Sequence, residues 1–209
     1  MGERWGCLIV DRPSRFVAAH ATGPRVGELA ERAVRQVHAR SAGRPLTWVG
    51  DGWQPYRRTI ERVYRRPVRT GQRGRPPLRV PAGVRLTQAI KRRDRRGRVR
   101  RVEVRASLGA PVAQPHPVHV ERRNGVLRDR LNCLTRKTHA FAKTAATWDA
   151  AVGLAVFEQN WLRPHPALRQ PIVAPDRRYR RRTPAMALDL TDHPWTWPEF
   201  LTTPVPVTP

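Results

Sequence analysis

Acidic side chains are scarce in this sequence of 209 residues. Asp and Glu together number 16, whereas Lys and Arg number 41, so the formal net charge is +25. Most of the basic residues are arginines, whose planar guanidinium groups match the oxygens of phosphate. This excess of one sign predicts a polyanionic partner. Nucleic acid is the first candidate, because each phosphate that a protein neutralises releases counterions.

The sequence also has few cysteines and no long apolar run. Cys7 and Cys133 are too few for a disulfide framework or a zinc site, and their apolar neighbours predict small core residues. No run of about 18 apolar residues is present to span a bilayer. No basic amphipathic segment has an apolar face wide enough to favour a membrane partner. Because no apolar signal region is seen either, we expect an intracellular protein.

Apolar periodicity predicts an α/β domain over residues 1–170. Short apolar runs are typical of strands, and apolar residues at helical spacing are typical of amphipathic helices. The predicted strands are residues 5–10, 16–21 and 46–49, and the predicted helices run from Val26 to Gly43, from Tyr56 to Tyr64, from Val118 to Lys143 and from Trp148 to Trp161. Proline residues at 164 and 166 end the last helix.

Residues 66–115 differ from the rest because they are rich in Arg, Pro and Gly. Alternation over 98–104 predicts a strand with one wet face, and we interpret the segment as an inserted basic β-hairpin flanked by loops. Its composition predicts a DNA-contacting region with no catalytic group and no core role. Its two acids, Asp94 and Glu103, lie among arginines, so we expect them to pair locally. The candidate DNA contacts of this segment are Arg98, Arg100 and Arg101.

Residues 171–209 form a basic tail that contains Pro and Trp. This composition predicts an extended or partly disordered segment. We expect Trp195 and Trp197 to dock it onto the domain.

Because acids are few, their positions are informative. Asp11 closes the first predicted strand, Asp51 closes the third between two glycines, and Glu121 lies at the start of a helix. The carboxyl ends of adjacent strands form the usual site crevice of an α/β sheet, and a helix crossing that edge would bring Glu121 beside both aspartates. Taken singly, each acid is better explained as a turn former or a helix cap. Three converging carboxylates would repel one another without cations, and oxygen ligands suit Mg²⁺ or Mn²⁺.

Three sequence blocks contain these acids: LIVDRPSRFVAAHATG around Asp11, TWVGDGWQPY around Asp51 and VERRNGVLRDRLNCLTRKTHAFAK with Glu121. Together they resemble the catalytic blocks of insertion-sequence transposases of the DDE type, in particular the bacterial and archaeal family typified by the insertion sequence "IS-one". The third block is the most specific, with Glu-Arg-x-Asn followed by Leu-Arg-x-Arg-Leu and Leu-Thr-Arg-Lys. The resemblance extends over roughly residues 5–165.

The resemblance implies a ribonuclease H-like mixed sheet flanked by helices. It implies that Asp11, Asp51 and Glu121 hold two Mg²⁺ or Mn²⁺ ions, and that the enzyme cleaves DNA and transfers transposon ends into a target duplex. Two such ions about 3.5–4 Å apart activate a nucleophile and stabilise the leaving oxygen. The family also implies a homo-oligomer on DNA and a cytoplasmic, nucleoid-associated location in a prokaryote.

Two departures from the family pattern stand out. Only two strands are predicted before the first helix, where the fold normally has three. Members of such families usually carry a module that binds the transposon end upstream, of helix-turn-helix or zinc-ribbon type. Only ten residues precede Asp11, which favours a second reading frame or a truncated copy.

Several further residues have both a functional and a structural interpretation. Asn124 and Arg128 share the helical face of Glu121 and either hold a phosphate or form a solvated polar face. Arg136 and Lys137 match family positions and either contact the DNA backbone or carry surface charge.

The remaining motifs favour structural roles. Trp53 and Tyr56 can stack on a frayed base, but packing between strand and helix is the better interpretation. His116 and His119 make a poor metal motif, because a helix would not point His119 and Glu121 the same way. The acids at 129, 149 and 158 are assigned to helix surfaces or caps.

Two functions therefore remain open. The first is a phosphoryl-transfer enzyme that acts on DNA. The second is a non-catalytic basic nucleic-acid-binding protein, including an inactive transposase remnant. The charge favours both equally, but only the enzyme has a use for three carboxylates that face a phosphodiester.

Overall fold

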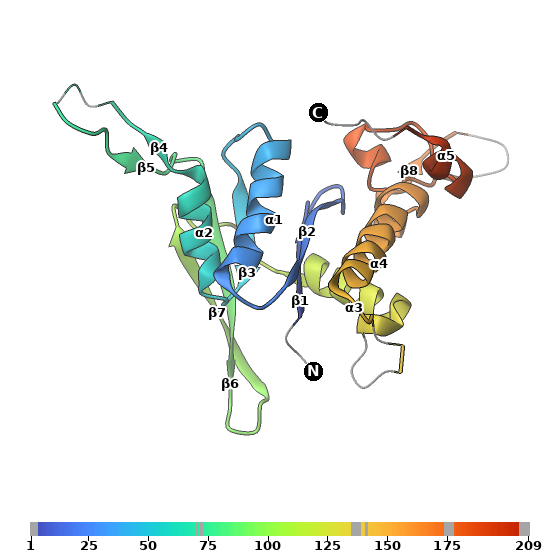
Figure 1. The fold of residues 1–209 in the computed structure, drawn as a ribbon, viewed down its shortest axis with the longest axis horizontal. Coiled ribbons are helices and arrows are strands. Elements are labelled where there is room, and N and C mark those ends of the chain that lie inside the picture. Colours follow the sequence, from blue (N-terminus) through green and yellow to red (C-terminus); the bar gives the residue numbers. More distant parts are fainter. Residues whose placement is uncertain are drawn as a thin grey trace. The chain divides into compact units, whose positions relative to one another are not determined.

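The computed structural model describes residues 4–69, 71, 73–134, 139–140, 142–173 and 178–204. The chain forms two compact units. The first contains Met1–Ile9 and Ala18–Asn124, and the second contains Val10–Val17 and Gly125–Pro209. The predicted α/β architecture, with a mixed sheet flanked by helices, is confirmed (Figure 1).

Strands and helices alternate over the first part of the chain. In chain order the described elements are β1 (Trp5–Val10), β2 (Val17–Gly23), α1 (Gly27–Arg40), β3 (Thr47–Asp51), α2 (Pro55–Tyr64), β4 (Arg66–Pro67), β5 (Leu78–Arg79), β6 (Arg85–Arg93), β7 (Val99–Leu108), α3 (Val118–Arg130), α4 (Ala145–Phe157), β8 (Gln170–Pro171), β9 (Tyr179–Arg180) and α5 (Trp197–Thr202). Short 3₁₀ turns cover Asn132–Leu134, Pro166–Leu168 and Met186–Leu188, and a π-helical turn covers Glu158–Leu162. Two strands precede α1, as predicted.

β6 is the central strand of a three-stranded sheet in the first unit. β3 lies parallel to it, with Thr47 opposite Arg85 and Asp51 opposite Ala89. β7 lies antiparallel on the other side and forms a long hairpin with β6. β1 and β2 pair in a separate two-stranded sheet.

The core of the first unit forms where α1 and α2 meet β6. Val34 of α1 and Ile60 and Tyr64 of α2 pack with Val84 and Leu86. All five side chains are at most 2% exposed. A second cluster joins β1 and β2 to α1 through Cys7, Ala21, Leu29 and Ala33, so the prediction that Cys7 is a small core residue is confirmed.

The prediction that residues 66–115 have no core role is wrong. Val84, Leu86 and Ala89 are buried and belong to the central strand and its approach. Arg and Pro dominate the segment around this short apolar run, and its burial depends on pairing with a strand far away in the sequence. The predicted strand at 98–104 is confirmed as part of β7.

The second unit is built around α4 and the π-helical turn that follows it. Asn160 in this turn is buried, and its side chain donates to the carbonyl oxygen of Val17 and accepts from the Val17 amide. The amide of Ala185 donates to the Asn160 carbonyl oxygen. π-Helical turns are rare and are often found at functional sites. Here it places one side chain against the backbone that follows Asp11.

The predicted helix from Val118 to Lys143 is too long. α3 ends at Arg130 and a 3₁₀ turn follows, because Asn132 and Cys133 are weak helix formers.

Glu158 has a larger role than the predicted helix surface or cap. It accepts from both Arg130 and Arg163, so it joins two helix ends. Partial burial opposes its ionised form, but these two hydrogen bonds outweigh burial and lower the pKa of Glu158. Asp129 and Asp149 are exposed on helices, as predicted.

The tail is more ordered than predicted. Trp195 packs against Trp161 with ring centroids 4.9 Å apart, which confirms its docking role. α5 follows, and Thr196 and Glu199 form a reciprocal capping box at its start. An extended tail is therefore wrong for the part that contains α5, since these caps and the aromatic contacts stabilise a short helix.

A substitution tests the core role of β6. Leu86→Ala should lower the free energy of unfolding by about 2–5 kcal/mol, because it leaves a cavity in a close-packed cluster. Val102 on β7 is 52% exposed, so Val102→Ala should change that free energy by no more than about 0.5 kcal/mol. Urea unfolding of both variants gives the comparison. If Leu86→Ala lowered the free energy of unfolding as little as Val102→Ala, β6 would be peripheral to the core.

Candidate functional site

Asp51 ends β3 between two glycines, Gly50 and Gly52, that are closely packed against neighbouring side chains. A Cβ atom at Gly50 would approach Tyr56 Cδ2 to 3.3 Å, and one at Gly52 would approach Ile90 Cγ2 to 3.2 Å. Glycines therefore permit close packing on both sides of the aspartate. The Trp53 amide donates to Asp51 Oδ1 at 3.1 Å. This hydrogen bond orients an exposed carboxylate at the end of the strand.

The pleat of the sheet places Asp51 on the face opposite the core. Trp48 is opposite Leu86 in register and packs with the core cluster. Side chains alternate between faces along a strand, so Asp51 lies on the other face with its partner Ala89. Lys91 follows Ala89 by two positions and shares that face. The backbone of Lys91 is about 4.8 Å sideways and about 6.7 Å along the strands from that of Asp51.

Glu121 reaches this same face through Lys91. The Lys91 Nζ atom lies 2.5 Å from Glu121 Oε1, and both side chains are partly exposed. The segment before α3 is attached nearby, because the Val112 amide donates to Thr87 Oγ1 at 3.0 Å. The first unit thus brings Asp51, Lys91 and Glu121 to one face of the three-stranded sheet.

Gln88 fixes the backbone around Asp51 from the other side of the sheet. Its Nε2 donates to the carbonyl oxygens of Asp51 and Trp53 at 2.7 and 3.2 Å. Its Oε1 accepts from the Ser107 hydroxyl at 2.7 Å. One buried amide therefore ties the end of β3 to β7.

The aromatic residues after Asp51 have the predicted packing role. Trp53 and Tyr56 meet edge to face with ring centroids 5.1 Å apart, and both pack on the Cys7 cluster. Burial raises the pKa of the Cys7 thiol to about 11, and burial also raises the pKa of Tyr56. Both groups therefore stay protonated at neutral pH and are no nucleophiles.

Asp11 begins a tight turn in the second unit. The Ser14 hydroxyl and amide both donate to Asp11 Oδ2, at 2.5 and 3.0 Å. The Asp11 amide donates to the Phe16 carbonyl oxygen, and Arg15 adopts a left-handed φ of 62°. Ser14 is buried. The turn therefore holds the Asp11 carboxylate in one orientation.

The structure divides the predicted triad between its two units. Asp51 and Glu121 belong to the first and Asp11 to the second. Among the residues that the structure describes, no group of three or more His, Cys, Asp or Glu side chains is arranged to hold a metal ion. Convergence of all three carboxylates stays a prediction.

The predicted supporting residues have different outcomes. α3 is helical through 121, 124 and 128, so Asn124 and Arg128 have the expected spacing from Glu121, and their roles stay predictions. Arg136 and Lys137 lie outside the described residues. His116 lies before α3 and His119 within it.

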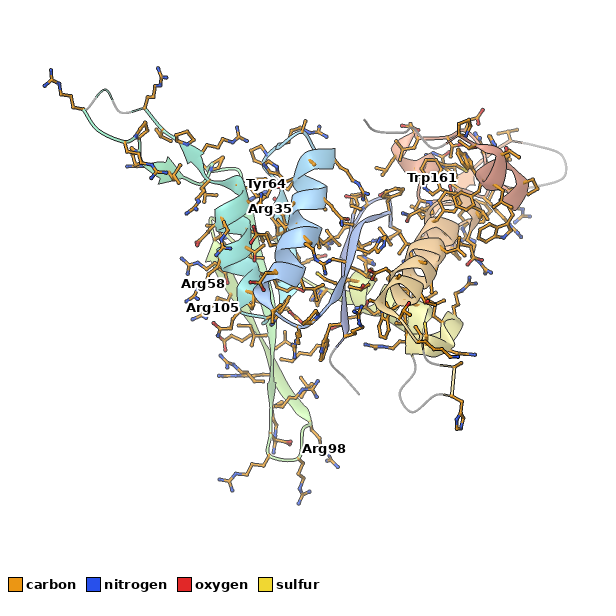
Figure 2. All side chains as sticks on the ribbon, in the orientation of Figure 1. Arg35, Arg58, Tyr64, Arg98, Arg105 and Trp161 are labelled. Carbon is orange, nitrogen blue, oxygen red and sulfur yellow. The ribbon has the colours of Figure 1, made fainter. Side chains whose placement is uncertain are left out.

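The arginines of the predicted DNA contact lie along the β6–β7 hairpin. Figure 2 shows Arg98 at the far end of the hairpin and Arg105 nearer its base. Six further arginines of the hairpin, at 92, 93, 95, 96, 100 and 101, are also exposed. The hairpin therefore presents a row of cations to solvent.

Local pairing of the two hairpin acids is confirmed. Asp94 lies 3.4 Å from Arg100 and accepts from the amides of Arg96 and Arg98. Glu103 pairs with Arg92 at 2.7 Å, and hydrogen bonding to this arginine lowers the pKa of Glu103.

Sequence patterns do not predict four residues that position the site: Ser14, Gln88, Lys91 and Asn160. Ser14 carries a signal, since a serine three residues after an aspartate is a common turn partner. The other three depend on strand register or on a contact across more than a hundred residues. Lys91 has one faint signal, because lysine is rare in a chain whose cations are mostly arginine.

Comparison with models of protein families, with curated proteins and with solved structures finds no match for this chain. None of the described helices is long and apolar enough to cross a membrane.

Proposed function

We propose that this protein is a DDE-type transposase, a metal-dependent enzyme with a ribonuclease H-like fold that cleaves DNA and joins transposon ends to a target duplex. The observation that carries the proposal is the placement of Asp51 and Glu121 on one face of the sheet, with Lys91 bound to Glu121. Their surroundings support it, because the chain has a large positive charge and exposed arginines on the adjoining hairpin.

The residues present fit a hard divalent cation in their donor chemistry. Asp51 and Glu121 offer carboxylate oxygens, the ligands that Mg²⁺ and Mn²⁺ prefer. The Lys91 ammonium group already forms an ion pair with Glu121, in the position where a cation would bind that carboxylate. Asp51 and Glu121, with Asp11 as the third ligand, would hold the metal. A bound pair of such ions would activate a nucleophilic oxygen and neutralise charge on the phosphate.

The chain's own residues would position the substrate. The Trp53 amide orients the Asp51 carboxylate, and the turn around Ser14 does the same for Asp11. Displaced by a metal bound at Glu121, the ammonium group of Lys91 would then be available to a DNA phosphate. The arginines of the β6–β7 hairpin would hold the duplex backbone beside this face.

A non-catalytic nucleic-acid-binding protein is the second candidate. The exposed arginines of the hairpin favour it as much as they favour the enzyme. A binder has no need of an oriented Asp51 carboxylate, because a negative charge facing phosphate weakens binding. Removal of this carboxylate therefore separates the two functions.

Asp51→Asn should abolish cleavage while DNA binding persists or rises. The amide keeps the shape of the side chain but loses the anionic ligand, so cleavage should fall by at least roughly a hundredfold. The assay follows nicking of a plasmid that carries the DNA flanking the gene, with Mn²⁺ present. Asp149→Asn, the same change on the exposed surface of α4, is the control and should leave cleavage unchanged. Full activity of the Asp51 variant would place the chemistry elsewhere.

Lys91→Ala should make Glu121 a better metal ligand, because the ammonium group no longer competes. The Mn²⁺ concentration that gives half-maximal binding should fall by up to about fivefold, since an exposed ion pair contributes at most about 1 kcal/mol. DNA affinity should fall at the same time. Calorimetric Mn²⁺ titration measures the first effect, and Arg122→Ala on α3 is the control, since its exposed charge lies on the same helix as Glu121. An unchanged Mn²⁺ affinity in Lys91→Ala would argue against Glu121 as a ligand.

The hairpin arginines should bind duplex phosphates with little regard to sequence. Replacing Arg98, Arg100 and Arg101 with Ala should flatten the plot of log affinity against log salt by up to three contacts, each worth about −0.9. Thermal stability should change little, because these side chains are exposed.

A matched control replaces Arg35, Arg57 and Arg62 with Ala. These side chains are exposed, but each already pairs with a glutamate on α1 or α2, so the salt dependence should stay closer to that of the unchanged chain. Equal slopes for the unchanged chain and the hairpin variant would contradict the prediction. A collapse in melting temperature would show that the hairpin arginines belong to the core.

A further inference from the structure

A second basic projection leaves the first unit between β4 and β5 (Figure 1). Arg66 pairs with Arg79 and Pro67 with Leu78 in an antiparallel ladder, and the Val68 amide donates to the Pro77 carbonyl oxygen at 2.9 Å. These bonds hold the base of the projection together. Beyond them lies the sequence Arg-Gly-Arg-Pro-Pro, residues 73–77, which we call the arm.

Packing does not account for the side chains of the arm. Residues 73–77 are exposed throughout. Within the described part of the chain, neither Arg73 nor Arg75 forms an ion pair or a side-chain hydrogen bond. A Cβ atom at Gly74 would meet nothing within 4 Å. The composition of the arm therefore calls for another explanation.

The arginines around the arm create a concave, purely cationic surface. Arg69 and Arg79 join Arg73 and Arg75 in lining a hollow of about 430 Å³, whose other lining residues are glycines and prolines. Among the described residues, no carboxylate lines this hollow. Four cations that line one hollow repel one another, and an anionic ligand would relieve that repulsion.

The backbone of the arm is narrow and set in shape. Gly74 has a φ of 113°, which side chains rarely adopt. The two prolines fix their own φ angles and carry no N–H group. The minor groove of B-DNA is about 6 Å wide, whereas a helix with its side chains is about 10–12 Å across. A slim segment without a Cβ atom between two arginines fits such a groove.

The chemistry of the arm favours one kind of groove. Runs of A·T pairs have a narrow minor groove with an enhanced negative potential, which attracts inserted arginines. The floor of that groove presents only acceptors, whereas a G·C pair adds the N2 amino group of guanine, a donor. Guanidinium groups are hydrogen-bond donors only. They therefore match the acceptors on the groove floor of A·T pairs and do not match the guanine amino group of G·C pairs.

We propose that the arm inserts into the minor groove of A/T-rich duplex DNA, with the Arg73 and Arg75 guanidinium groups directed at its floor. This inference rests on DNA as the partner in the proposed function and does not depend on the carboxylates. The β6–β7 hairpin differs from the arm in width. It is a two-stranded ribbon whose turn is capped by Asp94, so it is too wide for a minor groove and suits the phosphate backbone.

The test measures the affinity of the full chain for three short duplexes of equal length. One has a core of A·T pairs, one a core of G·C pairs, and one a core of inosine·cytosine pairs. Inosine·cytosine removes the N2 amino group from the minor groove and leaves the major-groove edges of G·C. The A·T and inosine duplexes should both bind about tenfold tighter than the G·C duplex. Equal affinity for all three, or inosine binding like G·C, would overturn the proposal.

A charge-preserving substitution identifies the residues responsible. Arg73→Lys with Arg75→Lys should keep the salt dependence but remove the preference for the A·T duplex, because the planar guanidinium is more weakly hydrated than an ammonium group. Arg98→Lys with Arg101→Lys on the hairpin is the matched control and should keep the preference. Loss of the preference in the control alone would assign it to the hairpin and refute the arm.

Two further outcomes separate this inference from its alternatives. An RNA duplex of the same sequence has a wide, shallow minor groove, so its binding should be insensitive to the lysine substitutions in the arm; an equal loss on RNA would overturn the proposal. Failure of the proposed enzyme is seen independently, as absent Mn²⁺-dependent cleavage by a chain that still prefers the A·T duplex.

Discussion

The parallel pairing of β3 with β6 is the interaction on which the first unit depends. One face of the pair presents Trp48 and Leu86 to α1 and α2 and closes the core. The other face presents Asp51 and Lys91, and Lys91 forms an ion pair with Glu121. A shift of one residue in this register would turn the core side chains to solvent and the carboxylate inward. Stability of the core and placement of the candidate site are therefore set by the same hydrogen bonds.

Most of the acids in the described part of the chain pair with arginines or accept hydrogen bonds from a turn or helix cap. On α1 and α2, Glu31 and Glu61 pair with arginines along the helix. On the hairpin and at the end of α4, Glu103 and Glu158 do the same. Asp11 and Asp51 differ, because in the described part of the chain neither forms an ion pair, and each accepts hydrogen bonds from donors of its own turn. In a chain of charge +25, two carboxylates oriented in this way support a role other than charge balance.

Patterns of neighbouring residues predict the strands and helices that local interactions stabilise. In the candidate site too, they predict the residues placed by local structure and miss those placed by contacts between distant parts of the sequence. Apolar runs and helical spacing reveal β3, α1 and α2, and the Gly-Asp-Gly sequence locates Asp51 at the end of its strand. β6 escapes prediction as a core element, because its burial comes from pairing with β3 and its Arg-rich flanks conceal a short apolar run. Lys91 reaches Glu121 only because β6 has one particular register, and Asn160 supports the backbone after Asp11 from 143 positions away. Such contacts have no signature in a single sequence.

Charge also explains why the proposed enzyme would need Lys91. Asp51 and Glu121 on one face would repel an approaching phosphate, and a hard cation has to enter against a protein that is strongly positive overall. Lys91 neutralises one of the two carboxylates, so the charge that an ion would meet on this face is mainly that of Asp51. Binding of the ion would then transfer the ammonium group from Glu121 to solvent or to DNA. On the proposed function, metal and DNA would therefore bind cooperatively, since each stabilises the arrangement in which Lys91 has left Glu121.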